Sequence, residues 1–133
     1  MTENEIAKIV FESYQRVLKT LGPGLLEKAY QTILAYELKK HGLIVETEVA
    51  LPVIYEDVIL DQAYRVDILV ENKVILELKA VDKLIDVHRS QLLTYLRMSH
   101  KKLGLLINFG SPLYAENFKR VLNCDNVAEL DNP

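Results

Sequence analysis

Cysteine is almost missing from this chain of 133 residues, in which Cys124 is the only one. A single cysteine cannot form a disulfide within the chain, and it supplies no cysteine–histidine cluster for a zinc site. The cysteine content therefore excludes a disulfide-stapled scaffold and favours a reducing compartment. We accordingly expect a cytoplasmic protein.

Long apolar runs are missing as well. No stretch approaches the roughly 20 residues that a membrane-spanning helix needs, and the amino terminus lacks the basic start and apolar core of a signal peptide. Repeats, low-complexity tracts and linkers are also absent. Half of the residues are hydrophobic, which is enough for a real core, so we expect one domain over residues 1–133.

Positive charge is not in excess. The chain has 16 Lys and Arg against 19 Asp and Glu, a net charge of −3, which is unlike a protein that wraps nucleic acid with a broad basic surface. The balance is still compatible with an acidic site whose contacts to phosphate are local. Basic residues available for such contacts are Lys28, Lys83, Arg89, Arg97, Lys101 and Lys102.

The most informative segment lies between residues 65 and 79. Two apolar runs rich in Val, Ile and Leu flank a polar break centred on Asn72, a pattern that predicts a β-hairpin. In this register Asp67 lies directly across from Glu77, with Cβ atoms roughly 5 Å apart, and Lys79 shares the face of Glu77. Such facing needs an odd-length loop or a bulge, because a slip of one residue flips the face.

Two acids and a lysine on one otherwise apolar face are not required for folding. Like charges that face each other destabilise a sheet unless a cation lies between them. A hard divalent cation held by carboxylate oxygens is the simplest relief. The alternative is a solvated face on which Glu77 and Lys79 form an ordinary surface pair worth about 0–1 kcal/mol.

A helix is expected after the break at Pro23-Gly24. Apolar residues there recur with a helical period, and Gly42 provides a common helix stop. Glu27, Tyr30 and Gln31 fall at i, i+3 and i+4, so they share one helix face. A solvated polar face accounts for such a stripe equally well.

A second polar stripe is expected on a helix that begins at Asp86, as its cap, and ends near Ser99. His88, Gln91 and Tyr95 form this stripe, beside an apolar stripe of leucines. A lone histidine in this position is more often a surface residue than a catalyst.

The remaining elements follow from periodicity and turn residues. Thr2 and Glu5 form the pattern of a capping box at the start of a first helix, which ends near residues 21–23. Pro52 predicts a bend or an edge in the first strand. A crossover helix between two strands predicts a parallel pair in a mixed sheet. The expected strands are 45–55, 58–70, 73–80, 103–108 and a short one at 118–122.

Together the motifs resemble the GxxExxY family of the PD-(D/E)XK nuclease superfamily. The resemblance rests on Gly24-x-x-Glu27-x-x-Tyr30, on Asp67 with Glu77-x-Lys79, and on His88-x-x-Gln-Leu-Leu-x-Tyr95-Leu, and it covers nearly the whole chain. It implies an α/β (α+β) fold with a restriction-endonuclease-like core, in which helices flank a mixed central sheet in the order α-β-β-β-α-β.

The resemblance also implies a metal-dependent nuclease that hydrolyses phosphodiester bonds of nucleic acid, most simply DNA. The implied ligands of Mg²⁺ or Mn²⁺ are Glu27, Asp67, Glu77 and the backbone carbonyl of Leu78. The implied catalytic residues are these three carboxylates together with Lys79 and Gln91. Further candidates for substrate contact or for support of the site are Tyr30, Arg65, His88 and Tyr95.

Two alternatives stay open. One is a catalytically inactive binding or assembly module on the same fold, because the superfamily includes members that have lost catalysis. The intact set of three carboxylates and Lys79 speaks against it. The other is a two-carboxylate glycosidase, in which the lysine and the hairpin would have no role. If the chain is a nuclease that cuts both strands of a duplex, it would gain from a twofold homodimer.

Overall fold

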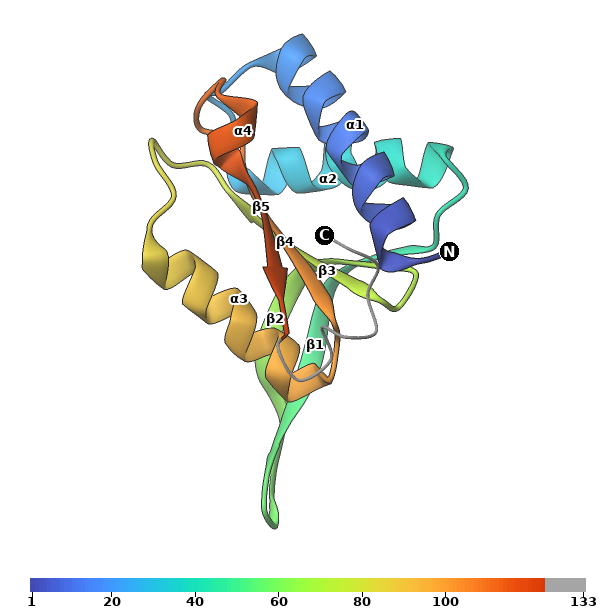
Figure 1. Cartoon of the computed structure of the whole chain (residues 1–133), viewed down its shortest axis with the longest axis vertical. Coiled ribbons are helices and arrows are strands. Elements are labelled where there is room, and N and C mark those ends of the chain that lie inside the picture. The colour runs from blue at the N-terminus through green and yellow to red at the C-terminus, as the bar shows by residue number, and fades with distance from the viewer. Residues whose placement is uncertain (124–133) are drawn as a thin grey trace.

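The computed structural model describes residues 1–123 and arranges them around a five-stranded sheet (Figure 1). The strands are β1 (Val45–Tyr55), β2 (Val58–Val70), β3 (Val74–Lys79), β4 (Leu103–Asn108) and β5 (Phe118–Leu122), and they lie in the sheet in chain order. The helices are α1 (Glu3–Leu21), α2 (Glu27–Lys40), α3 (Asp86–Ser99) and α4 (Tyr114–Asn117). Cys124 and the rest of the polar tail lie outside the described residues.

Strand pairing confirms the predicted mixed sheet. β3 and β4 run parallel and are joined by the crossover helix α3, whereas the other neighbouring strands pair antiparallel. A parallel pair requires such a crossover, because a tight turn can only reverse the chain. The short helix α4 was not expected from the sequence. No helix in the described part of the chain has the length and apolar character to span a membrane.

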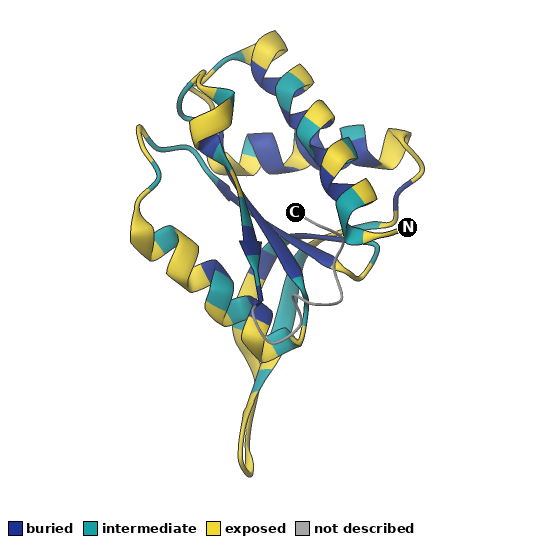
Figure 2. Ribbon diagram, in the orientation of Figure 1, coloured by how far each residue is buried: buried dark blue, intermediate teal, exposed yellow. Residues whose placement is uncertain are grey.

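The helices cover opposite faces of the sheet. α1 and α2 pack on one face, where Tyr14 and Tyr30 belong to the larger core. α3 packs on the other face, where Leu92 and Leu96 contact a second core that includes Ile75 of β3. Figure 2 shows the central strands buried between these layers. Side chains of β3 alternate between the two cores, as strand geometry requires.

The helix starts agree only in part with the sequence. Thr2 and Glu5 form the predicted capping box, in which each side chain accepts a hydrogen bond from the backbone N–H of the other, at 3.1 and 2.8 Å. The expectation that Asp86 caps α3 is wrong. The cap residue is Ile85, and its N–H donates to Nδ1 of His88 at 3.2 Å.

β1 and β2 extend beyond the rest of the sheet as a two-stranded arm, residues 51–64, at the bottom of Figure 1. β2 pairs with β3 only from Ile68 onward, so the arm has no third strand. The β1–β2 register shifts between Leu51 and Val53, which fits the bend predicted at Pro52. The arm is mostly exposed, as the yellow ribbon in Figure 2 shows.

Candidate active site at the fork of two strands

Asp67 and Glu77 face each other across neighbouring strands. β2 and β3 pair up to Ile68 and Leu76, and the loop between them consists of the three residues 71–73. The same register places Asp67 opposite Glu77. The structure therefore confirms the odd-length loop that the sequence required.

Where β2 and β3 separate, hydrogen bonds to the side chains of Asp67 and Glu77 take the place of the backbone hydrogen bonds between the strands. We call this place the fork. The N–H of Leu78 donates to Oδ2 of Asp67 at 2.8 Å, and the N–H of Asp67 donates to Oε1 of Glu77 at 3.4 Å. The carbonyl of Lys79 accepts from the N–H of Phe109 on the β4 side. Because successive carbonyls of a strand point to opposite edges, the carbonyl of Leu78 points toward the fork.

The two carboxylates at the fork are largely withdrawn from water. Burial raises the pKa of Glu77 to about 8, and the negative charge of Asp67 adds to this rise. Burial also raises the pKa of Asp67, although the bond from Leu78 partly opposes the effect. Lys79 lowers the pKa of both acids without restoring their ordinary values. The fork is thus a pair of half-buried acids with too little positive charge beside them, which a cation would stabilise.

Glu27 approaches this pair from a different layer. It is the exposed first residue of α2, and its charge raises the pKa of both Asp67 and Glu77. The charges of Glu27 and Lys79 therefore both act on the pair Asp67 and Glu77. These four residues are separated by up to 52 positions in the chain. Negative charge in the first turn also complements the helix dipole, so Glu27 stabilises α2 as well.

The oxygen donors at the fork suit Mg²⁺ or Mn²⁺ in their chemistry. These ions prefer carboxylate and carbonyl oxygens, and the fork offers Asp67, Glu77 and the carbonyl of Leu78. Within residues 1–123, no group of three or more His, Cys, Asp or Glu side chains is gathered to hold a metal ion. Mg²⁺ does not need such a cage, because it usually binds through one or two carboxylates and keeps several waters.

Tyr30 fixes the loop that leads to Glu27. Its ring is fully buried, and its hydroxyl donates to the carbonyl of Gly22 and accepts from the N–H of Leu25 at 3.1 Å. Gly24 lies within this loop at φ 122°, which glycine adopts without steric cost. The glycine, the acid and the tyrosine of the motif therefore form one structural unit. Tyr30 itself has no exposed surface for the substrate contact considered in the sequence analysis, so its role is support.

Tyr95 borders the fork on the α3 side. Its ring stacks on Tyr64 of β2, with centroids 4.2 Å apart and planes within 4°, and the hydroxyl of Tyr64 donates to the carbonyl of Tyr95 at 2.9 Å. Burial raises the pKa of both phenols, and the charge of Glu77 contributes to each. Tyr64 was not singled out from the sequence, where it is one aromatic in a strand.

Glu48 is an acidic neighbour that the sequence analysis missed. It lies on β1 at the level of Asp67, with φ 53°, which is rare for a non-glycine residue inside a strand. Its carboxylate pairs with Lys28 at 2.6 Å, and this bond lowers its pKa, with smaller contributions from Gln31 and Arg65. Its charge raises the pKa of Asp67. Arg65, a candidate for substrate contact, is thus placed beside an acid at the edge of the fork.

His88 and Gln91 are not joined to the acids. Gln91 is exposed on α3, and no hydrogen bond found among the described residues connects it to Asp67 or Glu77. The ring of His88 accepts from Ile85 and so holds the first turn of α3. Their roles in catalysis or substrate contact stay predictions.

Comparison with known proteins gives one result. A family model described as the PD-(D/E)XK nuclease superfamily matches residues 4–121. Searches of curated proteins and of solved structures found no significant match. The matched residues run from α1 into β5, and their mixed sheet flanked by helices is a restriction-endonuclease-like fold.

Proposed function

The chain belongs to the PD-(D/E)XK nuclease superfamily, and we propose on this basis that it is a metal-dependent nuclease. It would hydrolyse phosphodiester bonds of nucleic acid, most simply DNA. A fold alone does not fix a function. The observation that carries the proposal is the half-buried, facing pair Asp67 and Glu77, with Lys79 beside it and too little positive charge to balance both acids. Within the superfamily we propose the GxxExxY family, on the unit of Gly24, Glu27 and Tyr30.

The proposed ligands of Mg²⁺ or Mn²⁺ are Asp67, Glu77 and the carbonyl of Leu78, joined by Glu27 from α2. When bound, the ion supplies Lewis-acid activation of water and of the scissile phosphate. The protein keeps the ligands in place through its own backbone, since Asp67 accepts from Leu78 and Glu77 accepts from Asp67. Each of these bonds engages one oxygen of its carboxylate.

Lys79 is the proposed fixed cation of the reaction. Negative charge spreads over the phosphoryl oxygens in the transition state, and a positioned ammonium stabilises it without reorganisation. The lowering of the pKa of both acids by Lys79 supports this role, because the effect of a charge on a neighbouring acid weakens with distance. We further propose that Gln91 holds a water or a phosphate oxygen, and that Arg65 and Tyr95 contact substrate at the rim of the fork.

Cleavage of labelled nucleic acid tests the proposal. Purified protein is incubated with single- and double-stranded DNA and RNA in Mg²⁺, in Mn²⁺ and in chelator, and Mn²⁺ binding is followed by calorimetry. We expect metal-dependent cleavage of at least one substrate, and loss of both cleavage and Mn²⁺ binding in Glu77→Gln. Glu46→Gln, at an exposed position of β1, is the matched control. A wild-type protein that neither binds metal nor cleaves any of these substrates would refute the proposal.

A catalytically inactive binding module is the second candidate. The observation in its favour is the net charge of −3 on a chain of 133 residues, which leaves little room for a separate basic surface that reads nucleic acid. The same experiment separates the two candidates. Mn²⁺ or nucleic-acid binding that depends on Glu77, without cleavage in either metal, would select the inactive module.

A further inference from the structure

The arm, residues 51–64, exposes several large apolar side chains. Five of these residues each have between 52% and 70% of their surface exposed to solvent: Ile54, Tyr55, Val58, Ile59 and Leu60. A two-stranded hairpin is at best marginally stable on its own. Monomeric proteins also rarely leave a large contiguous apolar patch in water. The arm therefore has the character of a surface that another molecule covers.

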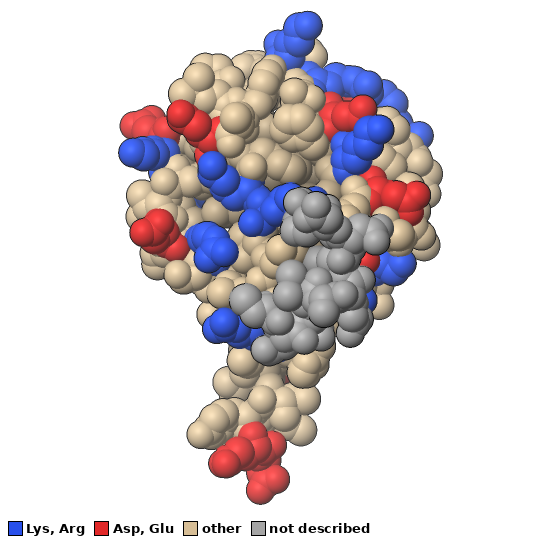
Figure 3. All heavy atoms as spheres, in the orientation of Figure 1, with Lys and Arg blue, Asp and Glu red and all other residues tan. Residues whose placement is uncertain are grey.

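The arm and its approach are acidic. Residues 46–61 contain five acids and no Lys or Arg. Two of the acids, Glu56 and Asp57, form the turn at the arm tip, which is red at the lower end of Figure 3. Neither takes part in an ion pair within the described part of the chain. This charge argues against nucleic acid as the partner of the arm, because phosphates would repel it.

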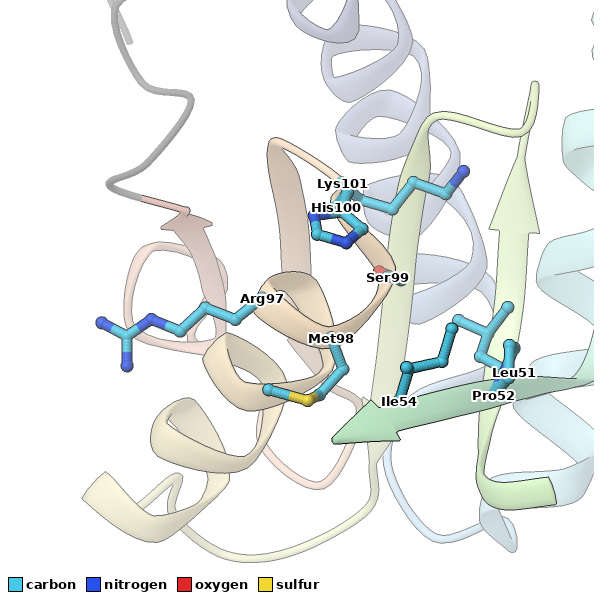
Figure 4. A pocket seen from close by; sticks show the side chains of 8 residues that line it. All are labelled: Leu51, Pro52, Ile54, Arg97, Met98, Ser99, His100 and Lys101. Carbon is cyan, nitrogen blue, oxygen red and sulfur yellow. The ribbon is translucent and has the colours of Figure 1, made fainter. Parts of the chain in front are cut away.

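A groove of about 330 Å³ lies at the base of the arm, beside the C-terminal end of α3 (Figure 4). The residues that line it include the apolar Pro52, Ile54 and Met98 and the basic Arg97 and Lys101. In Figure 4 the two basic side chains extend in opposite directions from the end of α3. No ion pair among residues 1–123 engages either of them.

We propose that this groove receives the arm tip of a second copy of the chain. The acidic tip complements the two basic residues of the groove, and Tyr55 beside the tip matches its apolar residues. The groove lies at the base of the arm, so two arms laid side by side in opposite directions bring each tip to the other copy's groove. This reciprocity is what a twofold interface requires, because the same surface must serve on both subunits.

Side-chain docking fits the arm better than extension of the sheet. Pro52 has no N–H and interrupts the row of donors along β1, which is a common device against edge-to-edge pairing. The partner surface must therefore offer apolar contact and positive charge rather than a free strand edge. The groove offers both, and it lies on this same chain. The inference does not depend on the proposed nuclease activity.

Charge reversal at the two surfaces tests the proposal. The tip variant is Glu56→Lys with Asp57→Lys, and the groove variant is Arg97→Glu with Lys101→Glu. Sedimentation velocity should give a dimer for the wild type and the 15.2 kDa monomer mass for each variant alone. An equimolar mixture of the two variants should recover a dimer, because one contact then joins two reversed surfaces and the other joins two native ones. The control is Glu12→Lys with Glu116→Lys, exposed acids on α1 and α4, which should remain dimeric.

Each alternative outcome overturns the proposal. A monomeric wild type at the highest soluble concentration would show that the groove receives no second copy. A tip variant that stays dimeric would place the interface elsewhere. Two monomeric variants whose mixture stays monomeric would show that tip and groove do not meet. Recovery in the mixture also excludes misfolding, since unfolded variants could not restore each other.

Discussion

The side chain of Asp67 accepts the hydrogen bond that the backbone of Leu78 would otherwise make to a neighbouring strand. The N–H of Leu78 donates to Oδ2 of Asp67 at 2.8 Å, just beyond the last ladder pair of β2 and β3. This bond ends the strand pairing and holds the carboxylate toward Glu77. Substitution of Asp67 will therefore change stability as well as any metal binding, so Lys79 is the cleaner probe of the site.

Lys79→Ala should remove cleavage while leaving divalent-metal affinity unchanged or higher. The substitution deletes a positive charge beside two acids, which favours a bound cation, but it also deletes the charge proposed to stabilise the transition state. We expect a loss in cleavage rate of at least ~10²-fold. Calorimetry with Mn²⁺ and single-turnover cleavage measure the two effects. Lys8→Ala, at an exposed lysine of α1, is the control, and a Lys79→Ala protein that cleaves like the wild type would exclude a catalytic lysine.

Stability of the metal-free protein should fall as pH rises from about 4.5 to about 8. The pKa of Glu77 is raised from 4.5 to about 8 in the folded state. Between these values the folded chain binds a proton that the unfolded chain has released. The contribution of protonated Glu77 is therefore complete below about pH 4.5 and is lost as pH rises through about 8. Melting temperatures in chelator should fall with pH more steeply for the wild type than for Glu77→Gln, and parallel curves would contradict this assignment.

Tyr30→Phe should loosen the loop before α2. The substitution removes a buried hydroxyl that bonds to Gly22 and Leu25, at an expected cost of about 1–3 kcal/mol in the free energy of unfolding. Denaturant unfolding measures this cost. Tyr36→Phe, at an exposed tyrosine of the same helix, should be nearly neutral. Equal effects of the two substitutions would show that the loop does not depend on the buried hydroxyl.

Glu48→Gly should be more stable than Glu48→Ala. Both substitutions delete the ion pair with Lys28, but only glycine adopts φ 53° without steric cost. We expect a difference of about 1 kcal/mol in favour of glycine, which is the reverse of the ordinary order inside a strand. Thermal unfolding of the two variants gives the comparison directly, and a more stable alanine variant would mean that residue 48 is not held in this conformation.

Gly110→Ala should destabilise the fold. An added Cβ would lie 2.0 Å from the carbonyl oxygen of Val81, which Asn108 holds through a hydrogen bond from its amide. Neither backbone can move aside cheaply, so we expect a loss of about 1–3 kcal/mol or more. Chemical unfolding of the variant tests this, with the exposed Ser90→Ala as the control. A loss within about 0.5 kcal/mol of that control would contradict the close approach.

The sequence was informative wherever a local pattern decides the structure. The apolar runs around Asn72 predicted both strands of the hairpin and the facing of Asp67 and Glu77, because strand alternation leaves only one register compatible with the turn. The capping box of Thr2 was predictable for the same reason, since both of its hydrogen bonds lie within four residues. Placement of Glu27 near the fork was expected only from the family resemblance, because it depends on packing between layers.

Other features depended on contacts that no local pattern reveals. Glu48 was missed because glutamate ordinarily avoids positive φ, and the ion pair that compensates comes from a distant helix. His88 was interpreted as part of a polar stripe, whereas its ring holds the first turn of α3. The helix α4, with four residues, is too short for periodicity to detect.

The short turn between β2 and β3 has a consequence for the order of folding. Three residues join these strands, whereas β4 reaches β3 only after the whole of α3 has crossed over. Short loops close faster than long ones, since less chain entropy must be lost. Asp67 and Glu77 therefore come together as a nascent hairpin before the parallel strand docks. The two acids are thus paired first and buried later, when β4 and the helices withdraw them from water and raise the pKa of Glu77.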